Sequence, residues 1–413
     1  MIVPGGRETP SLWSTLVEAR ARRLKDDNRW RSPVTFDARG PEGVLGEDGT
    51  KVVAFASNDY LGLSLHPAVV AAAHEALDTW GTGAGASRLV TGSRPVHDEL
   101  EAALAASTGS EAAAVFPTGF AANLGVLSAL GDAGVRICSD ELNHASIIDG
   151  ARLSRAEVAV YRHGDTEHLE ALLRAATGPA IVVSDLVFSM DGDTAPVAGI
   201  AEVCRRHGAL LVLDEAHAVL GPDPSPALAG VDVLRVGTLS KSLGSLGGFV
   251  AGSRAFVDLV VNRARSYIFT TALTPPDAAA ALAALRVATS AEGDRLRTRL
   301  ANHVARVKPG HPSPIIPIVL GSDERAVAAS AALREYGVWV PAIRPPTVPP
   351  GTARLRVTLS AAHTSMHIAL LLEALDAVPA VPRPPAAAPA GPGPSDAAAG
   401  TGAAPDAPTP ATR

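Results

Sequence analysis

Residues 210–241 read LLVLDEAHAVLGPDPSPALAGVDVLRVGTLSK and carry the clearest structural signal in the chain. Two short apolar runs, 210–213 and 233–237, show little polar alternation, which is typical of strands buried on both faces of a mostly parallel sheet. Asp214 follows the first run, and Lys241 follows the second. Ligands of open α/β sheets bind beyond the carboxyl ends of the strands, so both residues are predicted at one edge.

The same signal recurs along the chain. Most of the apolar runs are separated by roughly 10–25 residues, about the length that a crossover helix requires. The pattern predicts an α/β fold whose large domain has a seven-stranded, mostly parallel sheet flanked by helices on both sides. The runs are residues 113–116, 135–138, 158–161, 181–184, 210–213, 233–237 and 249–251.

The sequence divides into four predicted segments. Residues 1–55 form an N-terminal helix and arm, with helical spacing over 12–31 and a basic face typical of a solvated surface helix. Residues 56–290 form the large domain, and residues 291–377 form a smaller C-terminal α+β domain. Proline, alanine and glycine dominate residues 378–413, which are expected to be disordered because they cannot bury enough apolar surface.

The smaller domain is expected to alternate strands and helices more loosely than the large one. Strands are predicted at residues 315–320, 338–340 and 355–359, and helices at 327–336 and 366–375. No internal repeat is present in the sequence.

Composition excludes several classes of function. Lysine and arginine number 36 against 42 aspartates and glutamates, and no basic stripe or polybasic segment favours nucleic acid or an anionic membrane. No apolar segment is long enough to cross a bilayer, and residues 1–10 lack the apolar core of a signal peptide. Cys138 and Cys204 form no CxxC pair, which fits a reducing cytosol. We expect a cytoplasmic protein without a metal site.

Lys241 is a candidate for covalent chemistry. The chain has only four lysines, Lys25, Lys51, Lys241 and Lys308, because arginine supplies nearly all other positive charge. A desolvated lysine can lose its proton and form a Schiff base with an aldehyde, whereas a guanidinium is not a nucleophile at neutral pH.

Polar groups follow five of the predicted strands. Taken alone, each has a plainer interpretation: a loop histidine, a helix N-cap carboxylate, a turn at 191–193 or a surface lysine. Their convergence on one sheet edge favours a shared site. The residues are Gly119 and Phe120 at a glycine turn entering a helix, then His144, Ser189, Asp214, His217, Thr238 and Lys241.

A phosphate cradle, an acid and a lysine are what pyridoxal 5′-phosphate (PLP) requires. The helix N-terminus at Gly119 offers free backbone N–H groups to the phosphate. Lys241 would hold the aldehyde, and Asp214 would keep the pyridine nitrogen protonated. His217 could reach the ring hydroxyl, and His144 is placed to stack on the ring.

Seven motifs in order resemble the α-oxoamine synthases, PLP enzymes of the aspartate-aminotransferase fold. The resemblance covers residues 55 to 365 and rests on the motifs together, because each is weak alone. They are SNDYLGL at 57–63, GTGAGASR at 81–88, the Gly119-Phe120 turn, NHAS at 143–146, VFSMDGD at 187–193, DEAH at 214–217 and the Lys241 loop.

The resemblance assigns roles to individual residues. Gly119, Phe120 and Thr238 would contact the phosphate region, and Ser189 and His217 the ring hydroxyl region. Lys241, His144 and Asp214 would be the catalytic groups. The implied substrate contacts are Asn58, His144, Thr347, Arg344 for the amino-acid carboxylate, and Arg29, with Arg31 as its rival, for the acyl substrate.

Family members form homodimers whose active site lies at the subunit interface. The resemblance therefore implies that Thr271, or its neighbour Thr270, reaches the phosphate from the partner subunit. A plain strand-end turn is the alternative for these threonines.

AIRPPTVP at 342–349 and GTARLR at 351–356 are closest to family members that condense L-alanine with a pimeloyl thioester, in biotin biosynthesis. The acyl carrier, CoA or a carrier protein, stays open. The alternatives are a sister synthase that uses glycine and another acyl-CoA, a non-catalytic PLP carrier, and a transaminase. The chain departs from the family at Asp185, where Glu is usual, at Ala218, and in a shorter 294–315 stretch.

Overall fold

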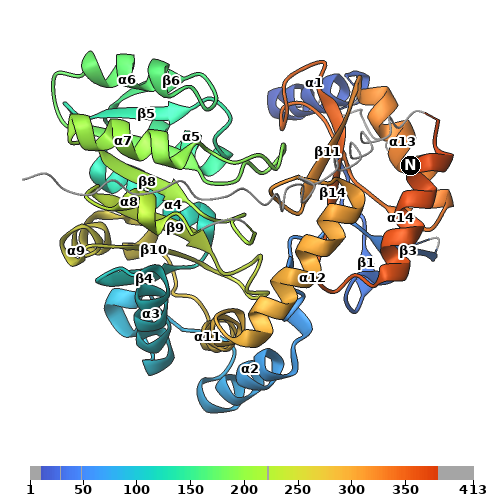
Figure 1. The fold of residues 1–413 in the computed structure, drawn as a ribbon, viewed down its shortest axis with the longest axis horizontal. Helices are drawn as coiled ribbons and strands as arrows, with labels where there is room; N and C mark the ends of the chain where they lie inside the picture. The colour runs from blue at the N-terminus through green and yellow to red at the C-terminus, as the bar shows by residue number, and fades with distance from the viewer. Residues whose placement is uncertain (1–10, 28, 48, 221–222, 380–413) are drawn as a thin grey trace, which may run out of the picture.

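A computed structural model describes residues 11–27, 29–47, 49–220 and 223–379. Figure 1 shows two lobes, with helix α12 (Ala291–Val307) running along the side of the second lobe that faces the first. The segment 1–10 and, from residue 380 onward, the tail expected to be disordered lie outside the described residues. None of the described helices is long and apolar enough to span a bilayer.

The first lobe is built on a seven-stranded sheet in the order β4-β10-β9-β8-β7-β5-β6. All seven predicted strands are confirmed, and among them β10 alone runs in the opposite direction to the other six. The strands are β4 (Ala112–Phe116), β5 (Arg136–Asp140), β6 (Glu157–Tyr161), β7 (Ala180–Asp185), β8 (Leu210–Asp214), β9 (Val233–Thr238) and β10 (Gly248–Gly252).

Alternate side chains of these strands point into two different cores, which explains why their sequences are apolar throughout. Val183 and Val212 pack in one core with helices α4 (Gly119–Leu130), α5 (Ala145–Leu153), α9 (Arg254–Arg263) and α10 (Arg265–Ile268). Val182 and Leu211 pack in the other with α6 (Thr166–Arg174), α7 (Val197–His207) and α8 (Ser225–Leu228). The sheet is therefore covered on both faces, as predicted.

Cys138 and Cys204 both lie in the second of these cores as free thiols. Burial raises the pKa of Cys138 to about 11 and that of Cys204 to about 12. Both thiols stay protonated at neutral pH and act as small apolar side chains.

The second lobe contains the antiparallel sheet β11-β14-β13, made of β11 (Ile315–Gly321), β14 (Ala353–Thr358) and β13 (Ala342–Ile343). Helices α13 (Asp323–Glu335) and α14 (Ser365–Ala377) pack in the same core as α12. The strands and helices predicted for this part of the chain are present, although several begin or end at different residues.

A four-stranded sheet joins the two ends of the chain in a way that the sequence did not reveal. It has the order β1 (Phe36–Ala38), β2 (Glu42–Leu45), β3 (Thr50–Ala54) and β12 (Val338–Trp339), and β12 pairs in parallel with β3. The N-terminal arm therefore packs with the second lobe. The boundaries expected at residues 55, 290 and 377 stay predictions.

Helix α1 (Leu12–Asp26) is shorter than predicted, because the helix expected over 12–31 ends at Asp26. The backbone N–H of Asp27 bonds to the carbonyl of Arg23, and that of Arg29 bonds to Leu24, which closes the helix end. No residue of α1 is buried, in line with a surface helix. Beyond it, the Arg31 guanidinium donates to the carbonyl of Pro345 at 3.1 Å.

The remaining helices link the lobes. They are α2 (Pro67–Trp80), α3 (Pro95–Thr108) and α11 (Pro275–Ala288), together with the short helices η1 (Leu63–Leu65) and η2 (Arg88–Gly92). Buried apolar residues of α2, α3 and α11, among them Val69, Leu100 and Leu282, belong to a single core that also contains residues of β11 and β14.

Two aliphatic residues on neighbouring strands test the two-sided burial of the sheet. Ile137 on β5 is fully buried, whereas Val160 on β6 is 55% exposed. We expect Ile137→Ala to destabilise the fold by about 2–5 kcal/mol through lost burial and a cavity. Val160→Ala should change stability by less than about 0.5 kcal/mol. Thermal unfolding of both variants measures this, and equal melting temperatures would contradict it.

Candidate active site

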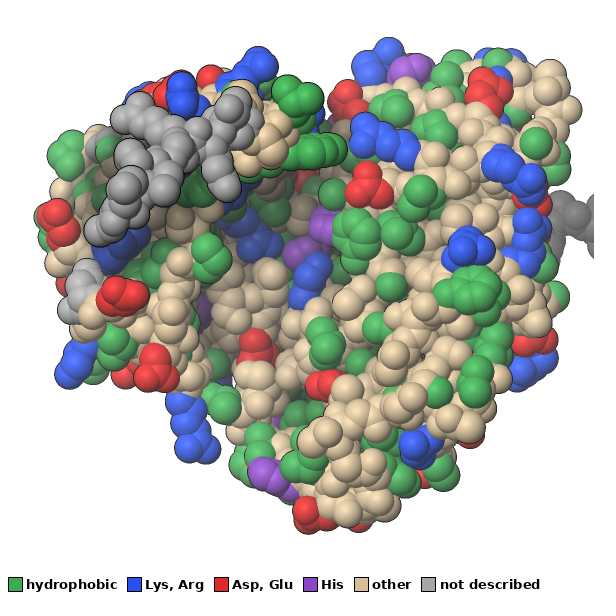
Figure 2. Space-filling model, turned by 180° about the vertical axis from the view of Figure 1, so that it is seen from behind, with side chains coloured by type: hydrophobic (Ala, Val, Ile, Leu, Met, Phe, Trp, Pro, Cys, Tyr) green, Lys and Arg blue, Asp and Glu red, His purple; other side chains and the backbone are tan. Residues whose placement is uncertain are grey.

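A cavity of about 240 Å³ lies at the carboxyl ends of the parallel strands. Figure 2 shows the molecule hollowed between its two lobes, with histidine and basic side chains inside the hollow. Seven of the predicted site residues line the cavity together. The lining residues are Thr118, Gly119, Phe120, Asn123, His144, Ser146, Asp185, Asp214, Ala216, His217, Gly237, Thr238, Ser240 and Lys241.

Lys241 lies in the loop after β9, and its Nζ is 2.7 Å from His217 Nε2. Burial lowers the pKa of Lys241 to about 8, an effect that the charges of Asp214 and Asp185 partly oppose. A substantial fraction of this amine is therefore neutral in mildly alkaline solution, as a nucleophile or general base requires.

His217 is held between Lys241 and Tyr60. Its Nδ1 is 2.6 Å from the Tyr60 hydroxyl, and both side chains are buried. Burial, together with the charges of Lys241 and Arg356, lowers the pKa of His217 well below its usual value. The imidazole is therefore neutral, with one ring nitrogen facing the lysine amine.

Asp214 ends β8 and is fixed by two hydrogen bonds. Its Oδ2 accepts from Asn123 Nδ2 at 2.6 Å, and its Oδ1 accepts from the backbone N–H of Ala216 at 2.8 Å. Asn123 also donates to Ser146 Oγ at 2.9 Å. An oriented, buried carboxylate in the cavity wall fits the protonated ring nitrogen of PLP.

Asp185 pairs with Asp214 across β7 and β8, which brings a second carboxyl group to the same edge. Burial, and then the Asp214 charge, raise the pKa of Asp185 well above its usual value. Its Oδ2 accepts from the backbone N–H of His144 at 2.7 Å. Asp185 therefore positions His144.

His144 is the N-cap residue of α5, where its Nδ1 accepts from the backbone N–H of Ser146. Burial is the main cause that lowers the pKa of His144. Its ring meets the Phe120 ring edge to face, with the centroids 6.4 Å apart. These rings flank the cavity, where a flat heteroaromatic cofactor could stack.

The opposite end of the cavity fits a phosphate. Gly119 begins α4 after its N-cap Thr118, so backbone N–H groups of the first turn point outward. Thr238 Oγ1 and Ser240 Oγ lie 2.7 Å apart beside it. A Cβ at Gly119 would come within 3.2 Å of the Thr238 Cβ, so glycine keeps this approach open.

A second pocket of about 460 Å³ is lined by Arg29 and Thr347, two of the predicted substrate residues. Arg31 instead bonds the backbone at Arg344 and Pro345. The wall of this second pocket is apolar apart from five polar residues, Arg29, Thr347, Glu141, Asn143 and Asp191. The apolar lining residues are Leu142, Ile148, Phe188, Met190, Pro345, Pro346, Val348, Pro349 and Pro350.

Four predicted site residues line neither the cavity nor the second pocket. Ser189 lies in the turn after β7, and its carbonyl accepts from Arg356 Nε at 2.6 Å. Arg344 is half-buried beside the second pocket, and Asn58 lies between Tyr60 and Arg356. Thr271 is exposed. Their predicted roles stay predictions.

Arg356 on β14 is the main site residue that the sequence reasoning missed. It is 5% exposed, and both of its terminal nitrogens lie 3.2 Å from Asn58 Oδ1. Its charge contributes to the lowered pKa of both Lys241 and His217. The available signal was a pair of arginines, Arg354 and Arg356, alternating with apolar residues in a predicted strand region. Tyr60, Asn123 and Asp185 were likewise not predicted as site residues.

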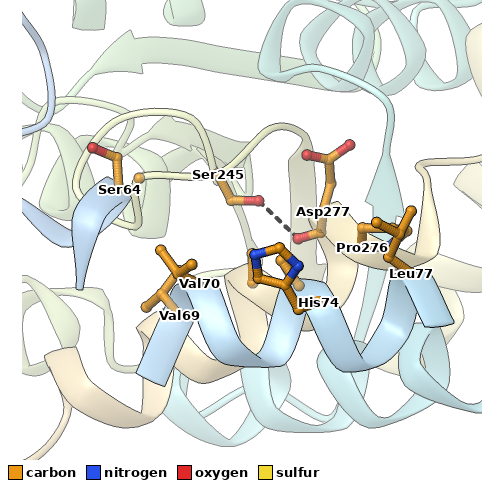
Figure 3. A pocket seen from close by; sticks show the side chains of 11 residues that line it. Ser64, Val69, Val70, His74, Leu77, Ser245, Pro276 and Asp277 are labelled. Atoms are coloured by element: carbon orange, nitrogen blue, oxygen red, sulfur yellow. Dashed lines mark hydrogen bonds between the residues drawn. The ribbon is translucent and has the colours of Figure 1, made fainter. Parts of the chain in front are cut away.

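A third pocket, of about 290 Å³, lies behind the Lys241 loop, between α2 and α11 (Figure 3). Ser245 Oγ donates to the carbonyl of Asp277 at 2.7 Å and so ties this loop to α11. No predicted site residue lines this pocket. The bond from Ser245 to α11 therefore supports the lysine loop from outside the cavity.

Comparisons with known proteins identify the family of the chain. Residues 50–375 match the family model for aminotransferase class I and II. The 8-amino-7-oxononanoate synthase of Anaeromyxobacter sp. (strain K) is 49% identical, over 84% of this chain and 92% of that protein. That of Methylobacterium nodulans is 49% identical, over 89% of this chain and 97% of the relative.

Solved structures give the same result. A serine palmitoyltransferase from S. paucimobilis, bound to PLP and myriocin, has a TM-score of 0.82 at 31% identity, covering 88% of this chain and 97% of its own. The 8-amino-7-oxononanoate synthase of Francisella tularensis has a TM-score of 0.65 at 28% identity, and the match covers 78% of this chain and 96% of that protein. The chain therefore belongs to the 8-amino-7-oxononanoate synthases, a family of PLP-dependent acyltransferases.

Proposed function

We propose that the chain condenses L-alanine with a pimeloyl thioester, forming 8-amino-7-oxononanoate, CO2 and the free thiol. The observation that carries this proposal is the half-buried Lys241 amine, 2.7 Å from His217 and accompanied by the Asp214 carboxylate in one cavity wall. The names of relatives that are 49% identical support this particular product.

The residues of the cavity would hold PLP in one orientation. Gly119, Thr238 and Ser240 would bind the phosphate, and Asp214 the ring nitrogen. His144 would stack on the ring, His217 would bond its hydroxyl, and Lys241 would carry the aldehyde carbon. When bound, PLP supplies an electron sink that stabilises negative charge on the substrate carbon.

Lys241 would act as the general base on alanine. Its Nζ removes the α-proton and later returns a proton, which requires a pKa close to the working pH. The lowered pKa of about 8 meets this requirement. His217 Nε2, at hydrogen-bond distance, keeps the amine aimed into the cavity.

Arg356 is our candidate for the alanine carboxylate, in place of Arg344. Its guanidinium is close enough to lower the pKa of Lys241, and its terminal nitrogens face the Asn58 amide oxygen. A guanidinium fork suits a carboxylate bound by two hydrogen bonds. Arg344 stays a predicted substrate contact at the rim of the second pocket.

The second pocket suits the acyl donor. Leu142, Ile148 and Met190 offer an apolar wall to a methylene chain. Arg29, which lines the same pocket, could pair with the distal carboxylate of a pimeloyl group. Thr347 would be a further contact, and the choice between CoA and a carrier protein stays open.

A homodimer is part of the proposal. Leu89, Val90 and Phe269 are 53%, 73% and 69% exposed, and an apolar surface of this kind favours a partner. A second copy that covers this surface would bring its Thr271 or Thr270 to the phosphate. A cytoplasmic location, expected from two free cysteines, also stays part of the proposal.

An assay of amino-acid and acyl donors tests the reaction. We expect thiol release with alanine and pimeloyl-CoA to exceed that with glycine or serine and with acetyl-CoA or palmitoyl-CoA. Lys241→Ala should abolish it, whereas Lys308→Ala should keep it, because Lys308 lies outside the cavity. Borohydride should fix PLP on Lys241 alone. Highest activity with serine and palmitoyl-CoA, or amino transfer without thiol release, would contradict the proposal.

The pKa of Lys241 has a direct consequence for labelling of the PLP-free protein. Only the neutral amine reacts with an acylating reagent, so labelling of Lys241 should rise with pH through a midpoint near 8. Arg356→Gln removes a charge that lowers this pKa and should move the midpoint to higher pH. Mass spectrometry of the Lys241 peptide, with the exposed Lys51 as reference, measures both. A midpoint near about 10.4, the ordinary lysine value, would contradict burial.

The two arginine candidates can be separated by kinetics. We expect Arg356→Met to raise the KM for alanine by about 10- to 100-fold, since hydrogen bonds to a charged group contribute about 1.5–3 kcal/mol. Arg344→Met should leave the KM for alanine within about twofold. The PLP absorbance and melting temperature of each variant serve as folding controls. A larger alanine effect at Arg344 would restore the role first predicted for it.

A further inference from the structure

The turn that follows β7, residues 187–194, is held by contacts from the second lobe. Arg354 bonds the Asp191 carboxylate, Arg356 Nε donates to the carbonyl of Ser189 at 2.6 Å, and Ser313 Oγ donates to the carbonyl of Gly192 at 2.6 Å. Phe188, Met190 and Asp191 of this turn line the second pocket, whereas no residue of the turn lines the PLP cavity.

From the first lobe, two kinds of contact reach the same turn: Phe188 packs in the core beside α6 and α7, and His163 forms hydrogen bonds. His163 Nδ1 lies 3.0 Å from Asp140 Oδ1 at the end of β5, and His163 Nε2 lies 2.7 Å from Asp193 Oδ2 in the turn. The His163 ring also packs edge to face on Phe188, with the centroids 4.4 Å apart. The imidazole therefore connects the turn to the central sheet.

Both ring nitrogens of His163 face carboxylate oxygens. A neutral imidazole has one N–H group and could donate to only one of them, whereas an imidazolium donates to both. Burial lowers the pKa of His163, but the bonds and charges of Asp140 and Asp193 outweigh this and raise it. The doubly bonded, charged form is the one that the geometry fits.

Other charged groups near this pair are accounted for. Glu141 accepts the backbone N–H of His163, and Arg162 is paired with Asp165 on the same loop. On the second-lobe side, burial is the main cause that lowers the pKa of His311 near Gly192, so it carries little charge. Asp140 and Asp193 are the charges that decide the state of His163.

We propose that His163 is a positioning residue for the acyl donor: its imidazolium joins Asp140 to Asp193 and so holds Phe188, Met190 and Asp191 in the wall of the second pocket. This inference rests on the proposed function, because it takes that pocket as the acyl-donor site. Loss of the imidazolium removes the hydrogen bond that ties Asp193 to the central sheet, while Phe188 stays packed in the first-lobe core. The turn then loosens around Met190 and Asp191, so the effect falls on acyl-donor binding rather than on PLP.

The direction of the pH dependence follows from the raised pKa of His163. We call the bonds from His163 to Asp140 and Asp193 the clamp. Both bonds are present while His163 is protonated, and the clamp is lost as the pH rises through the folded-state pKa of His163. The KM for the acyl donor should therefore rise on the alkaline side. The KM for alanine should change less, because Lys241 does not contact His163 and because Arg356, which bonds Ser189 in the turn, is also held by Asn58 and Thr358.

The test compares two histidine variants of the PLP-loaded enzyme. We expect His163→Gln to raise the KM for pimeloyl-CoA about tenfold at neutral pH, with kcat and the KM for alanine within about twofold and the alkaline rise removed. His207→Gln is the matched control, since His207 also faces a carboxylate, Glu170, but on the distant surface of α7. Asp193→Asn should shift the alkaline rise to lower pH. An unchanged acyl-donor KM in His163→Gln, or an equal rise in the alanine KM, overturns the proposal.

A second measurement does not depend on turnover. In protein labelled with 13C-histidine, the His163 NMR signal, identified by its loss in His163→Gln, should titrate above the ordinary histidine pKa and lower in Asp193→Asn. An unshifted titration overturns the clamp even if the enzyme is active. A wild type that is inactive with alanine and pimeloyl-CoA, but has the shifted titration, overturns the assigned function and leaves the clamp standing.

Discussion

The site depends on keeping one lysine amine out of water while carboxyl groups stay beside it. Desolvation disfavours the charged ammonium, and the Asp214 and Asp185 carboxyl groups favour it, so their balance sets the pKa of Lys241 near 8. That balance requires β7, β8 and β9 to end at the same level. The parallel register meets this condition, pairing Asp185 with Asp214 and Asp214 with Val236. The register of the sheet therefore fixes how close the two carboxyl groups lie to Lys241, and so sets the pKa of the lysine.

Much of the fold was predictable because its strands are apolar on both faces. Val182 and Val183 point into different cores, so neither needs a polar neighbour, and the run stands out in the sequence. The strands β1 and β2 gave no such signal, because they are short and partly exposed. β12 was predicted as a strand, but its pairing with β3 was not, because that pairing joins Val338 to Val53, far apart in the sequence. The length of α1 was overestimated at its C-terminal end, because basic residues continue past the C-cap residue Asp27.

The site residues likewise fall into those that the sequence could predict and those that it could not. Gly119, His144, Asp214, His217, Thr238 and Lys241 could be predicted, since each follows a strand of one parallel sheet. Arg356 could not, because its approach to Asn58 depends on how β14 packs against the N-terminal segment, and no local pattern encodes that contact. The same limit applies to Tyr60 and Asn123, whose importance lies in the groups that they orient. Solved serine palmitoyltransferase structures share this scaffold, and in our proposal acyl-donor specificity comes from the walls of the second pocket rather than from the lysine.

The pairing of β3 with β12 also bears on how the chain is assembled. During synthesis β3 emerges with one edge unpaired, and the strand that covers this edge, Val338–Trp339, follows almost three hundred residues later. An open strand edge is a site for mispairing with other chains. The large sheet can close before that point, because all of its strands precede residue 253. The N-terminal arm is therefore locked only after Val338–Trp339 has been made, so the proposed acyl-donor pocket, which Arg29 lines, is completed later than the large sheet.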